Sequence, residues 1–211
     1  MKSQSQINIK KSQRGYSLIE LSIVLAIIAV IIAGAVFGVQ AILRANNVNK
    51  TISQTNVAVN KIVAKLIRDT NYANATTQNL TRQGQDVWDT QYVNVVNGTV
   101  ENPFNGAVHV RALASAEGGL AVNEGFVYTI SGLPVSVCSD VAGGVEGLAT
   151  ALRVVNEAAG AAKTDVITTN PANSALVKNT DAATPYTYNQ AATGCAGATQ
   201  QSTVWFLVPR R

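Results

Sequence analysis

The chain has 211 residues, enough for one ordinary domain and an extension, and its formal net charge is +4. The charge is unevenly placed. Four of the sixteen basic residues lie in the first fifteen positions, which contain no acid, and the rest of the chain carries twelve basic and twelve acidic residues. Because no basic face remains beyond the N-terminal tip, the composition argues against a nucleic-acid partner.

Few side chains are suited to catalysis or metal binding. The chain has two cysteines, Cys138 and Cys195, and one histidine, His109. Two thiols without clustered histidines or carboxylates predict no metal site, and the absence of a C-x-x-C pair argues against a dithiol redox enzyme. We find no G-x-S-x-G motif and no phosphate loop, so we predict neither an enzyme nor a cofactor. In an exported chain the two cysteines are expected to form one structural disulfide.

A long apolar segment follows the basic tip. Residues 21–39 contain no charge and cover about 30 Å as a helix, the thickness of the hydrocarbon layer of a bilayer. The preceding cations predict a cytoplasmic N-terminus. A cleaved secretory signal would have a shorter apolar core, and a plain membrane anchor does not explain Glu20. An ionised acid in a membrane costs about 2.5–3.5 kcal/mol, and no nearby residue of the same helix offers Glu20 a counter-ion.

The stretch Gly15-Tyr16-Ser17-Leu18-Ile19-Glu20-Leu21, between a basic leader and the apolar run, resembles the class III signal of type IV pilins and pseudopilins. The resemblance implies that a prepilin peptidase cuts after Gly15 and N-methylates Tyr16, and that the apolar segment is retained. Tyrosine departs from the phenylalanine or methionine usual at that position. Glu20 would be the fifth mature residue, which in the family meets the N-terminal amine of a neighbouring subunit. The positions expected to serve assembly are Leu18, Ile19, Glu20, Leu21, Gly34 and Gly38.

The helical pattern continues beyond the apolar segment. Apolar or small residues recur every three or four positions from Ala45 to Leu66, which predicts one helix over 17–68, roughly 75–80 Å long. Gly34 and Gly38 form a G-x-x-x-G. This pattern is either the glycine common in membrane helices or a site of close helix approach. No proline precedes Pro103, so any local unwinding would depend on these glycines.

The remainder of the chain predicts a mixed α+β head. Residues 69–85 and 156–200 are expected to be loops, with strands near 92–95, 107–113, 125–131 and 152–155 and a helix after Val135. The apolar run 202–208 predicts an interior strand. Asn97-Gly98 predicts a turn, and His109 is expected at a surface or sheet edge.

Several of these pieces resemble type IVb pilins. They are Asn102-Pro103-Phe104-Asn105-Gly106 before a strand, residues 132–141 around the first cysteine, and residues 194–208 around the second. A bond between Cys138 and Cys195 would close a loop of about 57 residues and contribute roughly 4 kcal/mol in the chain-entropy model.

The sequence therefore predicts a pilin fold, a long N-terminal helix packed on an antiparallel sheet with one disulfide. The expected divisions are a leader (1–15), a transmembrane and filament-core helix (16–43), an amphipathic helix (44–70) and a head (71–211).

The expected role is a structural subunit of a type IVb-like pilus for adhesion, aggregation or conjugative contact. Its expected partners are other copies, the prepilin peptidase and the inner-membrane assembly machinery. It would begin in the inner membrane of a Gram-negative bacterium and end in an extracellular fibre. The alternatives are a minor pilin or pseudopilin and, from another class, a monomeric membrane-anchored binding protein.

Overall fold

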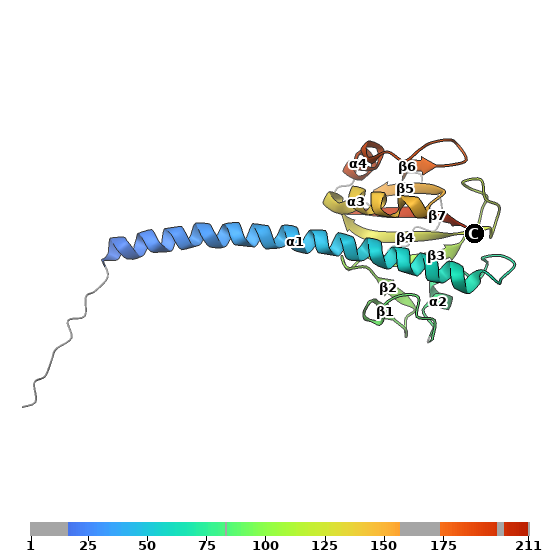
Figure 1. Ribbon diagram of the computed structural model, residues 1–211, viewed down its shortest axis with the longest axis horizontal. Helices are drawn as coiled ribbons and strands as arrows, with labels where there is room; N and C mark the ends of the chain where they lie inside the picture. The colour runs from blue at the N-terminus through green and yellow to red at the C-terminus, as the bar shows by residue number, and fades with distance from the viewer. Residues whose placement is uncertain (1–16, 83, 157–173, 198–200, 211) are drawn as a thin grey trace, which may run out of the picture. The chain divides into compact units, whose positions relative to one another are not determined.

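The computed structural model describes residues 17–82, 84–156, 174–197 and 201–210 (Figure 1). The chain divides between Leu43 and Arg44 into two compact units, which we describe separately. The first contains the apolar part of the N-terminal helix. The second contains the rest of that helix and the head.

The N-terminal helix α1 runs from Leu18 to Leu66, within two residues of the predicted bounds. In its apolar part every described residue is exposed, and the first buried side chain is that of Val48. Ala45, predicted to belong to the packed stripe, is exposed, because contact with the head begins only at the next turn. The stripe itself is confirmed, and its buried members are Val48, Thr51, Thr55, Ala58, Val59, Ile62 and Leu66.

The head contains one antiparallel sheet with strand order β1-β2-β3-β4-β7-β5-β6. The last strand in the chain, β7, lies between β4 and β5, as the apolar run 202–208 predicted. Gly98, with φ +64°, makes the predicted turn between β1 and β2. The strands are β1 (Val93–Asn94), β2 (Thr99–Glu101), β3 (Ala107–Ala112), β4 (Gly125–Pro134), β5 (Ala151–Asn156), β6 (Ser174–Asn179) and β7 (Gln201–Pro209).

Both faces of the interior strand β7 are covered. Val204, Phe206 and Val208 of β7 belong to the main core, which also contains the apolar members of the buried stripe of α1. Because side chains alternate along a strand, Trp205 and Leu207 belong to a second, smaller cluster. Burial on both faces explains why the sequence of β7 is apolar without alternation.

One buried polar contact accompanies this packing. The indole of Trp88 donates to the Tyr128 hydroxyl at 3.0 Å, and Thr55 of α1 also hydrogen-bonds to Tyr128. Burial is the main cause that raises the pKa of Tyr128 to about 12, so this phenol stays neutral and keeps its hydrogen bonds at physiological pH.

The disulfide joins two helices on one flank of the sheet. Cys138 lies on α3 (Val135–Val145) and Cys195 on α4 (Tyr188–Ala196), and their Cα atoms are 5.9 Å apart. Both cysteines are buried. The predicted α+β fold, a long N-terminal helix on an antiparallel sheet with one disulfide, is thereby confirmed.

Two segments expected to be loops contain regular structure. Residues 69–85 include α2 (Thr77–Leu80), a single turn. Its Thr77 side chain bonds the backbone of Val110 in both directions, on the part of β3 that extends beyond the pairing with β2. Residues 156–200 include β6 and α4. The prediction was wrong there because tertiary contacts, rather than a sequence period, stabilise them: β6 pairs with β5, and α4 is held by Cys195 and a Thr187 cap. The part of this predicted loop at 157–173 and 198–200 lies outside the described residues.

Candidate assembly site

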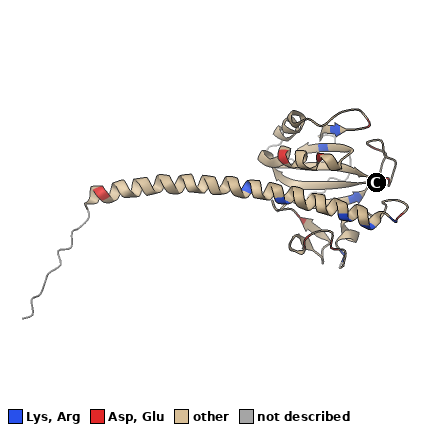
Figure 2. Cartoon of the chain, viewed as in Figure 1, with Lys and Arg blue, Asp and Glu red and all other residues tan. Residues whose placement is uncertain are grey.

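The apolar part of α1 is uncovered on every side of the helix. Large side chains all around it are exposed, including Leu18 at 87 % and Phe37 at 71 %. Its most apolar window has a mean hydropathy of 2.9 and none of that window is buried. Figure 2 shows this stretch without charged residues between the acid near its start and the cations of its second half. A helix that is apolar all round needs lipid or other helices as its surroundings.

Glu20 lies in the first turn of α1, where free backbone N–H groups and the helix dipole favour a negative charge. The turn is formed locally: the Leu21 amide donates to the Ser17 carbonyl at 3.1 Å, and Ser22 Oγ donates to the Ile19 carbonyl at 2.8 Å. Among the described residues, no cation forms an ion pair with Glu20. Its side chain is exposed and can accept a cation from outside this copy.

The other predicted assembly residues lie along the same helix. Leu18, Ile19 and Leu21 surround Glu20, and all three are exposed. Gly34 and Gly38 are exposed one helical turn apart, and a Cβ added at either would meet nothing within 4 Å. A single copy therefore gives these glycines no packing role. The predicted processing positions, Gly15 and Tyr16, lie outside the described residues.

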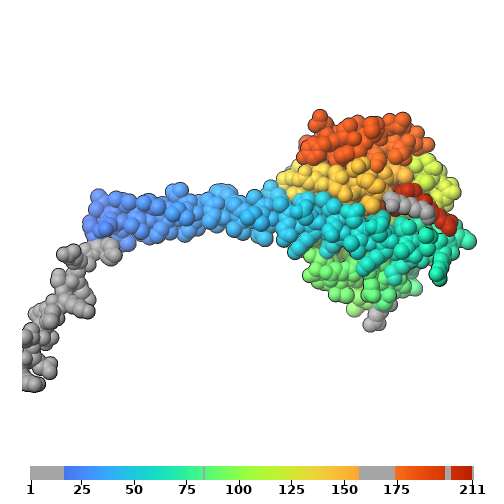
Figure 3. Space-filling view, viewed as in Figure 1, coloured from blue at the N-terminus to red at the C-terminus, as the bar shows by residue number. Residues whose placement is uncertain are grey.

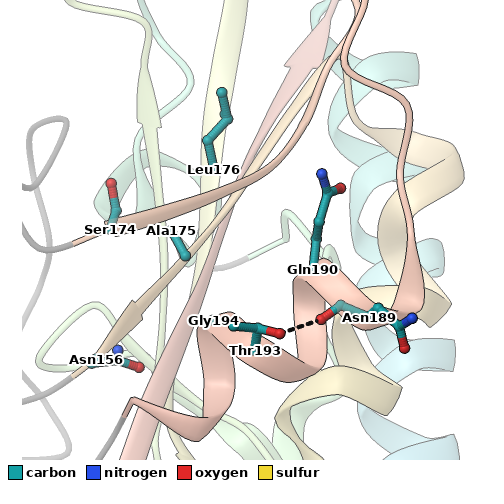
Figure 4. Close-up of a pocket in the computed structure, with 8 residues that line it drawn as sticks. All are labelled: Asn156, Ser174, Ala175, Leu176, Asn189, Gln190, Thr193 and Gly194. Carbon is teal, nitrogen blue, oxygen red and sulfur yellow. Dashed lines mark hydrogen bonds between the residues drawn. The ribbon is translucent and has the colours of Figure 1, made fainter.

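The head has an open hollow of about 640 Å³ between β6 and α4, shown in Figure 4. Amides and hydroxyls predominate among its polar groups, and Thr193 Oγ1 donates to the Asn189 carbonyl at 2.8 Å. None of the described lining residues is titratable, so they offer no acid or base to a reaction. The lining is formed by Asn156, Ser174, Ala175, Leu176, Asn189, Gln190, Thr193 and Gly194.

The single histidine is a partly buried residue of the sheet. His109 on β3 pairs with Thr129 of β4 and is partly buried, and burial, followed by the charge of Arg111, lowers its pKa. No cluster of three or more metal-ligating side chains occurs in the described part of the chain.

Sequence reasoning did not identify the exposed Tyr188 beside Asp140. The Tyr188 hydroxyl lies 3.4 Å from Asp140 Oδ1, joining α4 to α3. Two tyrosines in a polar segment, Tyr186-Thr187-Tyr188, were the available signal.

Comparisons with known proteins agree with this arrangement. Residues 10–36 match the prokaryotic N-terminal methylation motif. The chain is 29 % identical over 197 residues to the major structural subunit of bundle-forming pilus of Escherichia coli O127:H6, covering 87 % of this chain and 97 % of that one.

Two solved structures are similar to the fold. TcpA, a type IV pilin from Vibrio cholerae El Tor biotype, gives a TM-score of 0.50 at 19 % identity over 77 % of this chain and 98 % of that chain. A type IV b pilin from Salmonella typhi gives 0.47 at 18 % identity over 75 % and 97 %.

The chain therefore has the N-terminal methylation motif and the fold of a type IV pilin. Within that class, its sequence is similar along most of its length to a bundle-forming pilus subunit, as the predicted likeness to type IVb pilins implied.

Proposed function

We propose that this chain is a structural subunit of a type IVb-like pilus that polymerises through the apolar part of α1. The observation that supports it most directly is the uncovered apolar helix with Glu20 in its first turn. In a filament, neighbouring helices would cover this surface and remove it from both water and lipid. The relative whose sequence aligns with most of this chain is itself a major structural pilus subunit.

Glu20 would direct this polymerisation. An unpaired carboxylate is costly in a membrane, whereas an opposite charge in the same low-dielectric surroundings attracts it strongly. Cleavage after Gly15 would create such a charge, the N-methylated amine of Tyr16. The amine of an incoming copy and the carboxylate of its neighbour would then neutralise each other. Leu18, Ile19 and Leu21 would pack against adjoining helices, and Gly34 and Gly38 would allow close approach.

The proposed life cycle follows from the division of the chain. Residues 1–15 would be the leader removed by a prepilin peptidase, and 16–43 would hold the precursor in the inner membrane of a Gram-negative bacterium. Residues 44–70 would carry the head, 71–211, whose role would be structural rather than enzymatic. The inner-membrane assembly machinery would move the subunit into an extracellular fibre that serves adhesion, aggregation or conjugative contact.

Mass spectrometry of filaments sheared from the cell surface tests the proposal. We expect this chain to be the principal component and to begin at N-methylated Tyr16. Filaments without this chain, or a chain that retains residues 1–15 on the cell surface, would contradict it.

The Glu20→Ala variant tests the charge pairing. We expect processed protein to accumulate in the inner membrane with few or no fibres, because the incoming amine loses its counter-ion. Glu101→Ala, which removes an exposed acid from β2, is the matched control and should assemble normally. Normal fibre numbers in Glu20→Ala would refute the pairing.

A further inference from the structure

An exposed aromatic side chain lies beside an acid on the disulfide-linked helices. Tyr188, at the start of α4, is 56 % exposed. Its hydroxyl donates to Asp140 Oδ1 at 3.4 Å and accepts from Ser139 Oγ at 3.2 Å. The Cys138–Cys195 bond joins the two helices that carry these residues. An aromatic held in this way presents a large contact area at little cost in conformational entropy. We call Tyr188 and Asp140 the knob.

A stripe of basic, amide and apolar side chains, complementary to the aromatic and the acid of the knob, runs along the part of α1 that packs on the head. Lys50, Gln54, Val57 and Lys61 follow one another at spacings of four, three and four residues, so they share one side of the helix. Val57, in the middle of this Lys50–Lys61 stripe, is 47 % exposed. A hollow of about 410 Å³ separates the stripe from residues 86–90, and Val57, Val87 and Trp88 give it an apolar wall.

The helix segment that carries the stripe and the remainder of the head, which carries the knob, have net charges of opposite sign. Residues 44–68 contain five cations and no acid, whereas residues 69–211 contain seven cations and eleven acids. Among the described residues, both ion pairs lie outside α1, so the cations of the helix form no ion pair with a described acid of this copy. Lys61 donates to the backbone carbonyl of Asp86 instead.

The acids that line the hollow determine which end of the stripe an incoming carboxylate can approach. Asp86 and Asp89 line the same hollow as Lys61, and their negative charges disfavour a further acid there. Lys50 lies about three turns nearer the N-terminus than Lys61 and does not line that hollow. An approaching carboxylate is therefore expected at Lys50.

The knob and the stripe lie on different flanks of the same head. A Cβ on Gly144 of α3 would come within 2.3 Å of Ile52, so Ile52 faces α3. Val57 is five residues further on, about 140° around the helix. Figure 3 shows the two sides of α1 in the head, with the residues of α3 and α4 (gold to orange) on one and those of β1 and β2 (green) on the other. A contact between the knob and the stripe must then join two copies through unlike surfaces, and such contacts propagate into helical filaments when they do not close into rings.

We propose that the knob of one copy docks on the Lys50–Lys61 stripe of a second copy, with the Tyr188 ring against Val57 and Asp140 paired with Lys50. The inference rests on the proposed function, because it supplies a contact between heads in the fibre. It adds an outer contact to the helix packing and concerns residues outside the apolar segment.

Cysteine cross-linking in assembled fibres tests the docking. The full-length Val57→Cys and Tyr188→Cys double variant should, after mild oxidation, give a ladder of covalent multimers on non-reducing gels. Each single variant should give no ladder. The matched control is Val122→Cys with Tyr188→Cys, because Val122 is also about half exposed but lies in the β3–β4 connection. It should give no ladder either.

A second measurement uses unaltered fibres. Zero-length carbodiimide coupling followed by mass spectrometry should recover the Lys50–Asp140 peptide pair from multimer bands. It therefore decides the question even if the double variant does not assemble. Fibres that contain this chain but give neither the ladder nor this peptide pair would overturn the docking and leave the proposed function intact. Absence of this chain from the fibres would overturn the proposed function, and the docking with it.

Discussion

The two parts of α1 have the same secondary structure but opposite relations to their surroundings. From Val48 to Leu66, one side of the helix is buried against the sheet and the others carry lysines and amides. From Leu18 to Leu43, apolar side chains cover every side and none is buried. The first part belongs to a folded head, whereas the described residues bury no side chain of the second. The subunit therefore has an apolar helix surface that is left uncovered. Packing against the helices of other copies would bury this surface.

The comparison also separates two kinds of small residue. Gly34 and Gly38 have open space around them in a single copy, whereas Gly106 lies so close to Ser131 that an added Cβ would fall 1.9 Å from its carbonyl oxygen. The head uses its glycine within one chain. The glycines in the apolar part of α1 are free to contact lipid or another helix.

The largest expected effect on the head comes from removing its cross-link. Cys138→Ala with Cys195→Ala should lower the free energy of unfolding by about 4 kcal/mol, because the unfolded chain loses a 57-residue loop constraint. Urea denaturation of the detergent-solubilised full chain, followed by tryptophan fluorescence, measures this. Ser136→Ala, on an exposed position of α3, is the control, and an equal midpoint in both variants would show that the bond does not stabilise the head.

Removing the same side chain from the two parts of α1 sharpens the comparison. Ile62→Ala should destabilise the head by about 2–5 kcal/mol, since Ile62 is fully buried and its loss leaves a cavity. Ile23→Ala, in the exposed apolar part, should leave head unfolding unchanged. Both are measured by the same denaturation. Similar losses from the two substitutions would mean that the apolar part is packed on the head.

Adding one methyl group makes a smaller test of the same contrast. Gly106→Ala should cost about 1–3 kcal/mol of head stability, because the backbone must shift away from Ser131. Gly34→Ala should leave the head unchanged in the unassembled subunit. Gly147→Ala is the control within the head, because nothing lies within 4 Å of its added Cβ. Thermal unfolding of the three variants would contradict the expectation if Gly106→Ala matched Gly147→Ala.

The smallest expected effect is the pH dependence contributed by His109. Its pKa is lowered in the folded head, mainly by burial, so below about pH 6.5 the unfolded chain binds more protons than the folded one. The free energy of unfolding should therefore fall as pH falls from about 6.5 toward the folded pKa. His109→Gln should remove this contribution and flatten the profile. Denaturation midpoints of both proteins at several pH values measure it, and parallel profiles would exclude a role for His109.

The sequence alone determined the elements that need only local information. The apolar run, Glu20 and the three-to-four spacing from Val48 to Leu66 specify the helix and its buried side, because helix periodicity is a property of neighbouring residues. The composition of β7 likewise identified an interior strand, since burial on both faces leaves no polar alternation.

Only the tertiary structure decided the described residues 174–197. The strand β6 forms because β5 offers it a hydrogen-bonding edge, and α4 forms where Cys195 and Ala191 are buried against the head. The knob also depends on this packing, since Tyr188 meets Asp140 across 48 residues of chain. Contacts between distant segments leave little periodic trace in an Ala-, Thr- and Asn-rich sequence, because neither partner needs a local pattern to make them.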